Sequence, residues 1–227
     1  MIIVNSKLPP EIHTALKKFT DSVIPSPVAS KLPRELSAHP DMLIHVSPKG
    51  LICAPELHAP LKALGVDSIK GVKDPMLSYP EDIPFNCFYI NKALICNKKH
   101  TDTAILDTYR TLGYEVIHTN QGYASCSTLR LGSGIITADR SIATACEAAG
   151  AEVLLISPGG IELDGYSYGF IGGCGGTVGK SLLLFGDPLT HPDGKQIVSF
   201  AEKCGFSVSP LCNGKLSDYG GIIEYLT

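Results

Sequence analysis

The cysteines are the residues of this sequence best able to bond covalently to a substrate, and one of them lies in a setting that favours reactivity. A nucleophilic cysteine acts as its thiolate, so it needs partial exposure and polar neighbours. Cys126 lies between Ser125 and Ser127, next to Thr128 and close to Gly122, which makes its surroundings small and polar. We therefore predict Cys126 as a candidate nucleophile, with a buried thiol on a polar strand as the alternative.

The remaining cysteines have settings that favour packing. The sequence holds eight cysteines but no Cys-x-x-Cys pair of the kind found in zinc ribbons and redox motifs. Cys53, Cys96 and Cys146 lie within apolar runs, where a free thiol packs as a small core residue. Cys174 lies between two pairs of glycines and is the second candidate nucleophile. No spacing of His, Asp or Glu matches a metal site, so we expect no metal.

His45 is a candidate acid–base group, because an imidazole changes its protonation near neutral pH. It lies within an apolar run, and alternation along a strand places it on the same face as Leu43 and Ser47. If this face points to the centre of the protein, the imidazole could meet Cys126. A core histidine held by hydrogen bonds is the alternative.

The composition excludes several classes of function. Of the 227 residues, 44% are apolar and 18% are charged, which is typical of a compact globular protein and not of a disordered one. The net charge is −3, and no cluster of Lys and Arg exceeds two residues, so we expect no nucleic-acid partner. No apolar run reaches the roughly 18 residues that cross a bilayer, and no basic segment opens a signal peptide. We therefore predict a cytoplasmic protein without a membrane partner.

Four segments of the chain repeat one layout, which is a short apolar strand, an amphipathic helix that ends at Gly, and a second strand. Each Gly stands where a helix needs a left-handed residue after its last turn, a conformation that Gly adopts without steric cost. The strands and the intervening helix-ending glycines are 50–54, Gly65 and 66–70; 93–97, Gly113 and 114–118; 134–138, Gly150 and 151–155; and 181–185, Gly205 and 206–209.

A further strand precedes each of these segments, so the unit is a ββαβ repeat of roughly 45 residues. Turn residues at 48–50 and 132–134 separate two of the paired strands. The additional strands are predicted at 41–47, 86–91, 125–131 and 169–176.

A fifth unit forms only if the two ends of the chain are joined. Strands at 2–5 and 22–24 and a helix around 11–19 supply its later elements, and a strand at 221–226 supplies its first. A ring closed in this way has no exposed sheet edges. The alternative is a two-domain doubly wound fold, although the strands and helices do not alternate singly. We predict a single domain over 1–227, with units of about 41–73, 85–120, 122–158, 168–212, and 216–227 joined with 1–26.

The segment 175–181, Gly-Gly-Thr-Val-Gly-Lys-Ser, resembles a phosphate-binding loop but does not satisfy the motif. The motif requires Gly where this sequence has Cys174, and it requires a helix to follow. An apolar strand and a turn follow instead. We predict closely packed Gly-rich backbone near the ring axis.

The five-unit architecture resembles the pentein superfamily, whose fold is a five-bladed α/β propeller with pseudo-fivefold symmetry. In its enzymes a Cys attacks the carbon of a guanidinium group, a His moves protons and carboxylates hold the guanidinium. The superfamily also contains a ribosome anti-association factor that does no chemistry. The resemblance implies a small guanidino or amidino compound as the partner and no cofactor.

The local resemblance is nearest to dimethylarginine dimethylaminohydrolase and arginine deiminase. Segment 80–91 looks like the penultimate unit of the hydrolase, and 122–129 looks like the segment that carries its nucleophile. This match implies Cys126 as the nucleophile. It implies His45, on the first strand of the unit that precedes segment 80–91, as the acid–base group. Asp218, before Gly220 and Gly221, looks like the carboxylate of a Gly-Gly motif. The order of units would then be circularly permuted relative to the hydrolase.

Further residues are expected to contact the substrate. Glu162 and Asp164, which follow another Gly-Gly pair, are alternative guanidinium anchors. Asn86 could line the same centre, and Arg130 could bind a substrate carboxylate. Surface or turn positions are the alternative for these residues.

Two hypotheses follow for the function. The first is a hydrolase that acts on a guanidino or amidino compound through Cys126. The second is a binding or assembly protein that keeps the ring but has lost the catalytic set. The family's acidic residue after Gly-Gly is replaced here by Ile222, which favours the second hypothesis, whereas the polar setting of Cys126 favours the first.

Overall fold

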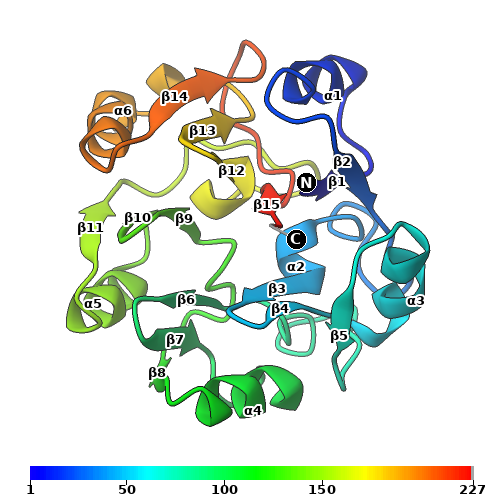
Figure 1. Cartoon of the computed structure of the whole chain (residues 1–227). Coiled ribbons are helices and arrows are strands. Elements are labelled where there is room, and N and C mark those ends of the chain that lie inside the picture. The colour runs from blue at the N-terminus through cyan, green and yellow to red at the C-terminus, as the bar shows by residue number, and fades with distance from the viewer. Residues whose placement is uncertain (226–227) are drawn as a thin grey trace.

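Five small sheets stand around a common axis in the computed structural model, which describes residues 1–225 (Figure 1). Each sheet has three strands, and the middle strand pairs antiparallel with the inner strand and parallel with the outer one. The helix that connects the middle and outer strands of each sheet lies on the outside of the ring (Figure 1). The predicted α/β propeller of repeated ββαβ units is confirmed.

Each blade combines an inner strand, a middle strand, a helix and an outer strand. Blade 1 consists of β15 (Ile223–Glu224), β1 (Ile2–Asn5), α1 (Pro10–Leu16) and β2 (Val23–Ser26); blade 2 of β3 (Ile44–Ser47), β4 (Gly50–Cys53), α3 (Pro55–Ala63) and β5 (Ser68–Lys70); blade 3 of β6 (Phe88–Ile90), β7 (Ala93–Cys96), α4 (Thr103–Thr111) and β8 (Glu115–His118); blade 4 of β9 (Thr128–Leu131), β10 (Gly134–Thr137), α5 (Arg140–Ala148) and β11 (Glu152–Leu155); and blade 5 of β12 (Gly175–Val178), β13 (Ser181–Leu184), α6 (Gly194–Lys203) and β14 (Ser207–Pro210). Short helical turns precede β3, β12 and α6, namely α2 (Pro40–Leu43), the 3-10 turn Ile171–Cys174 and the 3-10 turn Pro188–Thr190.

The ends of the outer helices follow the sequence signals closely. Asp102 and Asp139 cap α4 and α5, because each carboxylate accepts a hydrogen bond from a free amide of the first turn. The glycines predicted to end the helices all have left-handed backbone, with φ of +76° at Gly65, +69° at Gly113, +76° at Gly150 and +85° at Gly205.

Both ends of the chain contribute to blade 1. β15 pairs antiparallel with β1, with Ile2 opposite Glu224 and Ile3 opposite Ile223. The amino terminus donates a hydrogen bond to the carbonyl of Tyr225 at 3.1 Å, and the Tyr225 amide donates to the Met1 carbonyl at 2.9 Å. The predicted strand at 221–226 is therefore present at its centre; positions 226 and 227 lie outside the described residues.

Three inner strands begin at least three residues later than the sequence suggested, and the other two begin two residues later. Residues 41–43, expected in a strand, form the turn α2, because Pro40 is suited to the first position of a helix. Residues 171–174 form a 3-10 turn, and β12 begins only at Gly175. The expected strand at 125–131 begins at Thr128. The residues before these strands are thus free to form turns at the axis.

The Gly-rich segment 175–181 is a hairpin between β12 and β13 and does not lead into a helix. A Cβ atom on Gly175 would lie 1.9 Å from the Leu183 carbonyl oxygen, and one on Gly176 would lie 2.4 Å from the Ile222 carbonyl oxygen. Neither distance is sterically possible, so the close approach of backbone requires glycine here. The packing interpretation of this segment is confirmed.

The segments that precede the five inner strands contact one another in a closed circle, which we call the axial collar (residues 41–42, 86, 125–126, 172–174 and 218–221). Every blade is joined to its two neighbours through it. The contacts, in order round the ring, are Asn86 Nδ2 to Met42 Sδ at 3.1 Å, Asn86 Nδ2 to Cys126 Sγ at 2.8 Å, Gly172 N to Cys126 O at 2.8 Å, Gly221 N to Gly173 O at 3.0 Å, and Asp41 N to Gly220 O at 3.2 Å.

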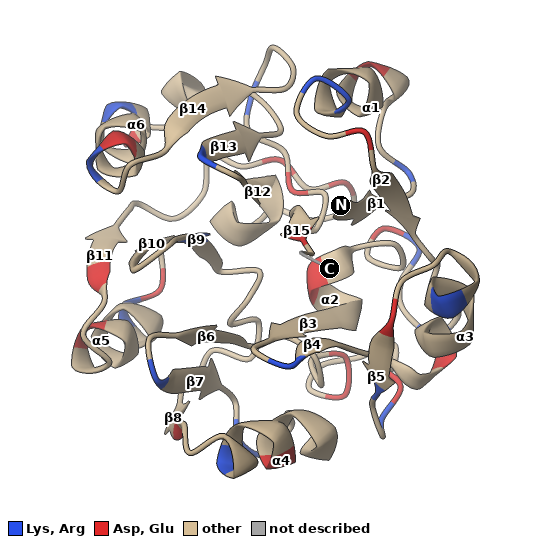
Figure 2. Cartoon of the chain, in the orientation of Figure 1, with Lys and Arg blue, Asp and Glu red and all other residues tan. Residues whose placement is uncertain are grey.

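Charged residues lie mostly on the outer helices and connecting loops (Figure 2). An acidic residue on α2 is an exception, because this turn stands next to the centre of the ring (Figure 2). Within residues 1–225, no helix has the length and apolar character to span a membrane.

The collar predicts a strong effect of one glycine. A Cβ atom on Gly172 would lie 2.3 Å from the Ser125 carbonyl oxygen and 2.5 Å from that of Cys126, and neither backbone atom can move freely. We expect Gly172→Ala to lower the free energy of unfolding by roughly 3 kcal/mol, as overpacking does. Gly65→Ala is the control, because its Cβ meets open space and costs only about 1 kcal/mol of backbone strain. Urea denaturation measures both variants, and equal losses would contradict the role of the collar.

Candidate active site at the ring axis

Cys126 lies in the collar with its side chain in contact with two other blades. Its thiol is within 2.8 Å of Asn86 Nδ2 and 3.6 Å of Met42 Sδ, and only 4% of the residue is exposed. Asn86 Oδ1 also accepts the amide hydrogens of Ser125 and Cys126, at 2.8 and 3.2 Å. Asn86, predicted to line the centre, therefore fixes both the backbone and the thiol of Cys126.

Asp41 is a buried carboxylate whose oxygens are available to a ligand. It is 7% exposed, and neither of its oxygens accepts a hydrogen bond of normal geometry from residues 1–225. Burial, followed by the charge of Asp218, raises the pKa of Asp41 to about 7, and the neighbouring Cys126 thiol opposes this rise. A buried carboxylate without a donor is costly, so Asp41 has the capacity to bind a cation.

Asp218 is equally buried but is held by the backbone. Its carboxylate accepts hydrogen bonds from the amides of Phe170 at 2.8 Å and Gly220 at 3.0 Å. Burial raises the pKa of Asp218 to about 6, and these two hydrogen bonds limit the rise. The predicted Asp218 therefore lies beside the centre in a fixed orientation.

His39 lies next to Asp218, with Nδ1 3.7 Å from Oδ1. Burial, and then the charge of Lys7, lower the pKa of His39 to about 4, so its ring is neutral at pH 7. The contact is therefore not an ion pair at neutral pH.

The structure does not bring His45 to Cys126. Ile44 and Val46, its neighbours on β3, line the pocket at the axis, whereas His45 lies on the opposite face of the strand. Its ring nitrogens contact the Cys87 carbonyl and the Tyr109 hydroxyl, both at 2.9 Å. Burial lowers the pKa of His45 to about 3. The expectation that the His45 face points to the axis is wrong.

The acidic alternatives at 162 and 164 lie away from Cys126. Glu162 is exposed, and Lys215 Nζ lies 3.3 Å from its carboxylate. Asp164 is exposed at the edge of a separate pocket of about 190 Å³, which His39 and Asp218 also line. Glu162 is thus not positioned to share a ligand with Cys126.

Cys174, the second candidate nucleophile, also belongs to the collar and is buried. Its thiol donates to the Phe170 carbonyl at 3.3 Å. Burial, followed by the charges of Asp218 and Asp41, raises the pKa of Cys174 well above its usual value. Burial, followed by the charges of Asp41 and Asp218, also raises the pKa of Cys126 well above its usual value. Both cysteines are therefore neutral thiols at pH 7.

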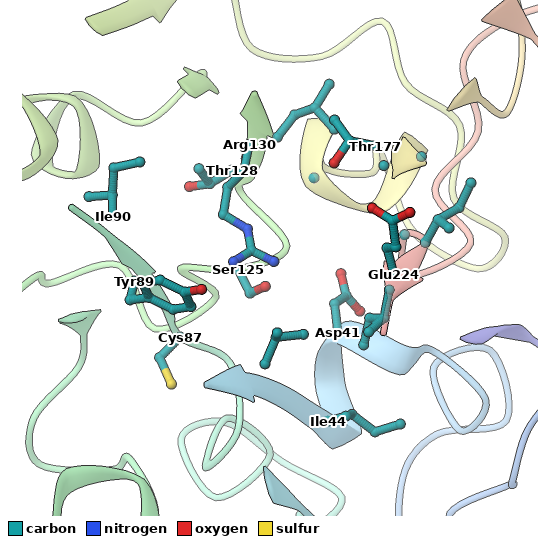
Figure 3. A pocket seen from close by; sticks show the side chains of 18 of the residues that line it. Asp41, Ile44, Cys87, Tyr89, Ile90, Ser125, Thr128, Arg130, Thr177 and Glu224 are labelled. Atoms are coloured by element: carbon teal, nitrogen blue, oxygen red, sulfur yellow. The ribbon is translucent and has the colours of Figure 1, made fainter. Parts of the chain in front are cut away.

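A pocket of about 280 Å³ lies along the axis on the side of the collar where the β-hairpins turn. Arg130 on β9 and Asp41 on α2 both point into it, and Tyr89, Thr128 and Thr177 add hydroxyl groups (Figure 3). Arg130, predicted to bind a substrate carboxylate, thus shares a pocket with Asp41.

Sequence reasoning missed Asp41 because it placed 41–47 in one continuous strand, and it did not consider His39. A signal was available in the repeat, since Asp41, Asn86 and Cys126 all stand shortly before the inner strand of their units. Pro40 is a second signal, because proline favours the first position of a helix and so indicates that the strand begins later than residue 41.

Comparisons with solved structures show that this ring has the pentein fold. A dimethylarginine dimethylaminohydrolase from Pseudomonas aeruginosa, a cysteine-to-serine variant complexed with citrulline, superposes with a TM-score of 0.55 and 7% identity over 92% of this chain and 90% of that chain. A histidine-to-glycine variant of a dimethylarginine dimethylaminohydrolase, an adduct with S-methyl-L-thiocitrulline, gives a TM-score of 0.56 and 7% identity over 92% and 91%. An amidinotransferase of the saxitoxin pathway from Microseira wollei has 13% identity over 92% and 87%, with a TM-score of 0.49.

The sequence itself belongs to a family of unknown function, DUF6873, whose model matches residues 3–223. No curated protein matches the sequence. The fold is therefore shared with guanidino-modifying enzymes, and the function has to be argued from the site.

The buried acids predict a dependence of stability on pH. A carboxyl whose pKa is raised on folding stabilises the protein below its unfolded pKa of 3.8 and loses this contribution as pH rises through its folded pKa, here about 7 for Asp41. Relative to wild type, Asp41→Asn should therefore gain about 1.4 kcal/mol for each pH unit between 5 and 7. Urea denaturation of the two proteins at several pH values measures this gain.

The comparison between the two proteins is needed because the buried histidines act in the opposite direction. The lowered pKa values of His39 and His45, about 4 and about 3, cost stability as pH falls below their unfolded value of 6.5. Both proteins share that effect, so it cancels in the difference. A difference independent of pH would contradict a raised pKa at Asp41.

Proposed function

We propose that this protein cleaves a C–N bond of a guanidino or amidino compound through a covalent intermediate on Cys126. The observation that carries the proposal is that the Cys126 thiol lies beside two buried carboxylates, one of which, Asp41, accepts no hydrogen bond of normal geometry from residues 1–225. A shared fold with a dimethylarginine dimethylaminohydrolase is consistent with this function.

A guanidinium group suits this environment. It is planar, permanently charged and offers pairs of N–H donors that match carboxylate oxygens. Bound between Asp41 and Asp218, it would supply the donors that Asp41 lacks and would bring its central carbon next to the Cys126 thiol. Its charge would also lower the pKa of the thiol, which the two carboxylates otherwise raise.

The chemistry then follows in two steps. The Cys126 sulfur attacks the central carbon, its proton passes to the Asp41 carboxylate, and the amine departs after taking that proton. This leaves a thiouronium-type intermediate. A water molecule then attacks the same carbon, loses its proton to Asp41, and the C–S bond breaks to return the thiol and release a urea-type product. Asp41 thus takes the acid–base role expected of His45, and Asp218 and Asn86 hold the substrate and the thiol.

We also infer that the order of blades is circularly permuted relative to the hydrolase. The support for this is the position of the nucleophile candidate, Cys126, in the middle of the chain and of Asp218 near its end, with both termini in blade 1.

One observation favours a second function, a binding protein that does no chemistry. The Cys126 side chain lines none of the described pockets, and Met42 and Asn86 cover its sulfur. In this alternative the polar residues of the collar hold the blades together and have no substrate. Covalent labelling of Cys126 by thiol reagents distinguishes the two functions.

A matched pair of thiol reagents tests the proposal. Chloroacetamidine is a cation and chloroacetamide is its neutral analogue, so a site built for a guanidinium should favour the former. We expect chloroacetamidine to modify Cys126 at least tenfold faster than chloroacetamide does, as measured by mass spectrometry of the intact protein and its peptides. Asp41→Asn should remove the preference, because the carboxylate that attracts the cation is lost.

Cys126→Ser and Cys204→Ser are the controls. Cys204 is only partly buried and has no carboxylate pair around it, so its loss should leave the fast reaction unchanged. Arginine, methylated arginines or agmatine should slow labelling of Cys126. Equal rates for the two reagents, spread over several cysteines and with no product from these compounds, would favour the binding protein.

The raised pKa values also predict how guanidinium binding depends on pH. A guanidinium binds the ionised carboxylates, so below a pH of about 7 the binding has to displace protons from Asp41 and Asp218. We expect the affinity for methylguanidine to rise by up to a hundredfold per pH unit below a pH of about 6, where both carboxyls are protonated, by up to tenfold per unit between about 6 and 7, and then to level off. Calorimetric titration in two buffers of different ionisation enthalpy measures both the affinity and the protons released. Binding that is constant from pH 5 to 8 would contradict the assignment.

A further inference from the structure

Arg130 is a charged residue that the proposed reaction does not use. It projects from β9 into the axial pocket, on the hairpin side of the collar (Figure 3). Among residues 1–225, no carboxylate forms an ion pair with it, whereas the exposed Arg110 pairs with Asp107. Burial lowers the pKa of Arg130, and the groups that oppose this change are Tyr89, Tyr109 and Cys87, none of which is a carboxylate. A guanidinium in such a place lacks a counterion.

Within residues 1–225, neither of the acids that share the pocket forms an ion pair with Arg130. Glu224 accepts a hydrogen bond from the Gly179 amide at 3.0 Å. Asp41 belongs to the collar, and the side chains that shift its pKa are Asp218 and Cys126, not Arg130. Neither acid accepts a hydrogen bond from Arg130. The N–H groups of the Arg130 guanidinium are therefore open to a ligand.

The other polar groups of the pocket suit an anion. Thr128 and Thr177 present hydroxyls from the inner strands of blades 4 and 5, and Tyr89 presents a phenol from blade 3 (Figure 3). The Thr128 hydroxyl has no hydrogen-bond partner within residues 1–225. Hydroxyls and a guanidinium are the donors that hold carboxylates and phosphates in proteins. The volume of about 280 Å³ admits a small molecule.

We propose that the axial pocket is a binding site for an oxyanion, a carboxylate or a phosphate, held by Arg130 with hydroxyls of Thr128 and Thr177. The oxyanion has two sources. It is either the acidic end of the guanidino substrate, a case that rests on the proposed function, or a separate small anion, a case that does not.

The first test uses inorganic phosphate and wild-type protein. We expect phosphate to bind in calorimetry, and Arg130→Met to weaken it at least tenfold because the charge is removed while the bulk of the side chain remains. Arg110→Met is the matched control, since it removes an exposed arginine on α4. Phosphate also stabilises proteins non-specifically, and the control measures that contribution. Thr177→Val should weaken binding about threefold, a smaller effect because it removes one neutral donor.

The second test separates the sources by comparing arginine with agmatine, which lacks the carboxylate. If the substrate carries the anion, arginine should bind wild type at least tenfold more tightly than agmatine, and Arg130→Met should remove this preference. If the anion is separate, the two compounds should bind equally while phosphate binding still depends on Arg130. Labelling of Cys126 by chloroacetamidine reports on the guanidinium site independently, so its failure is distinguishable from that of the anion site.

Should Arg130→Met not fold, the Nε–Hε resonance of Arg130 in the wild-type protein provides the measurement. Titration with phosphate should shift this resonance and leave that of Arg110 unmoved. Unchanged resonances, or phosphate and arginine affinities that do not depend on Arg130, would overturn the proposal.

Discussion

The axial collar is the constraint on which the other features of this structure depend. Each blade is a three-stranded sheet too small to be stable in isolation, and the ring has no single sheet that crosses it. The collar joins all five blades by contacts between segments far apart in sequence, such as Asp41 with Gly220 and Gly172 with Cys126. To bring segments so far apart in sequence into contact costs conformational entropy when the chain folds. Each contact requires the neighbouring blades to be in place, so we expect the contacts of the collar to form cooperatively.

The same constraint explains why polar residues lie at the centre of an otherwise apolar core. The turns before the inner strands leave backbone amides and carbonyls without sheet partners, and buried polar groups need partners. Asn86 and Asp218 satisfy two such amides each. Asp41 does not take part in this way, because only its amide bonds to the collar. The stability of the ring therefore accounts for Asn86 and Asp218 but not for the free carboxylate of Asp41, and this difference is the physical argument for a ligand.

The sequence predicted the ring well and the site only in part. Helix ends at Gly65, Gly113, Gly150 and Gly205 are local features, which a left-handed backbone alone determines, so they could be read without a structure. The direction in which His45 points could not be predicted in this way. Its strand has apolar residues on both faces, and alternation does not say which face meets the axis. The repeat gave the positions of the inner strands but not where each begins. That uncertainty of a few residues was enough to hide Asp41.

The pocket at the axis arises because the five blades are not equivalent. Blades 5 and 1 place glycines at the centre, and backbone packing requires them, as the contacts of Gly175 with Leu183 in blade 5 and of Gly221, before β15, with Gly172 show. Glycine has no side chain to fill the axis, so close packing between strands leaves space inside the ring. Blades 3 and 4 face this space with larger polar side chains, Arg130 among them. A fully symmetric ring would either close its axis with five side chains or leave it open with none. The asymmetry places the large side chains of Tyr89 and Arg130 on one side of the pocket and glycine backbone, with Thr177 and Glu224, on the other. The two sides therefore offer different groups to a molecule in the pocket.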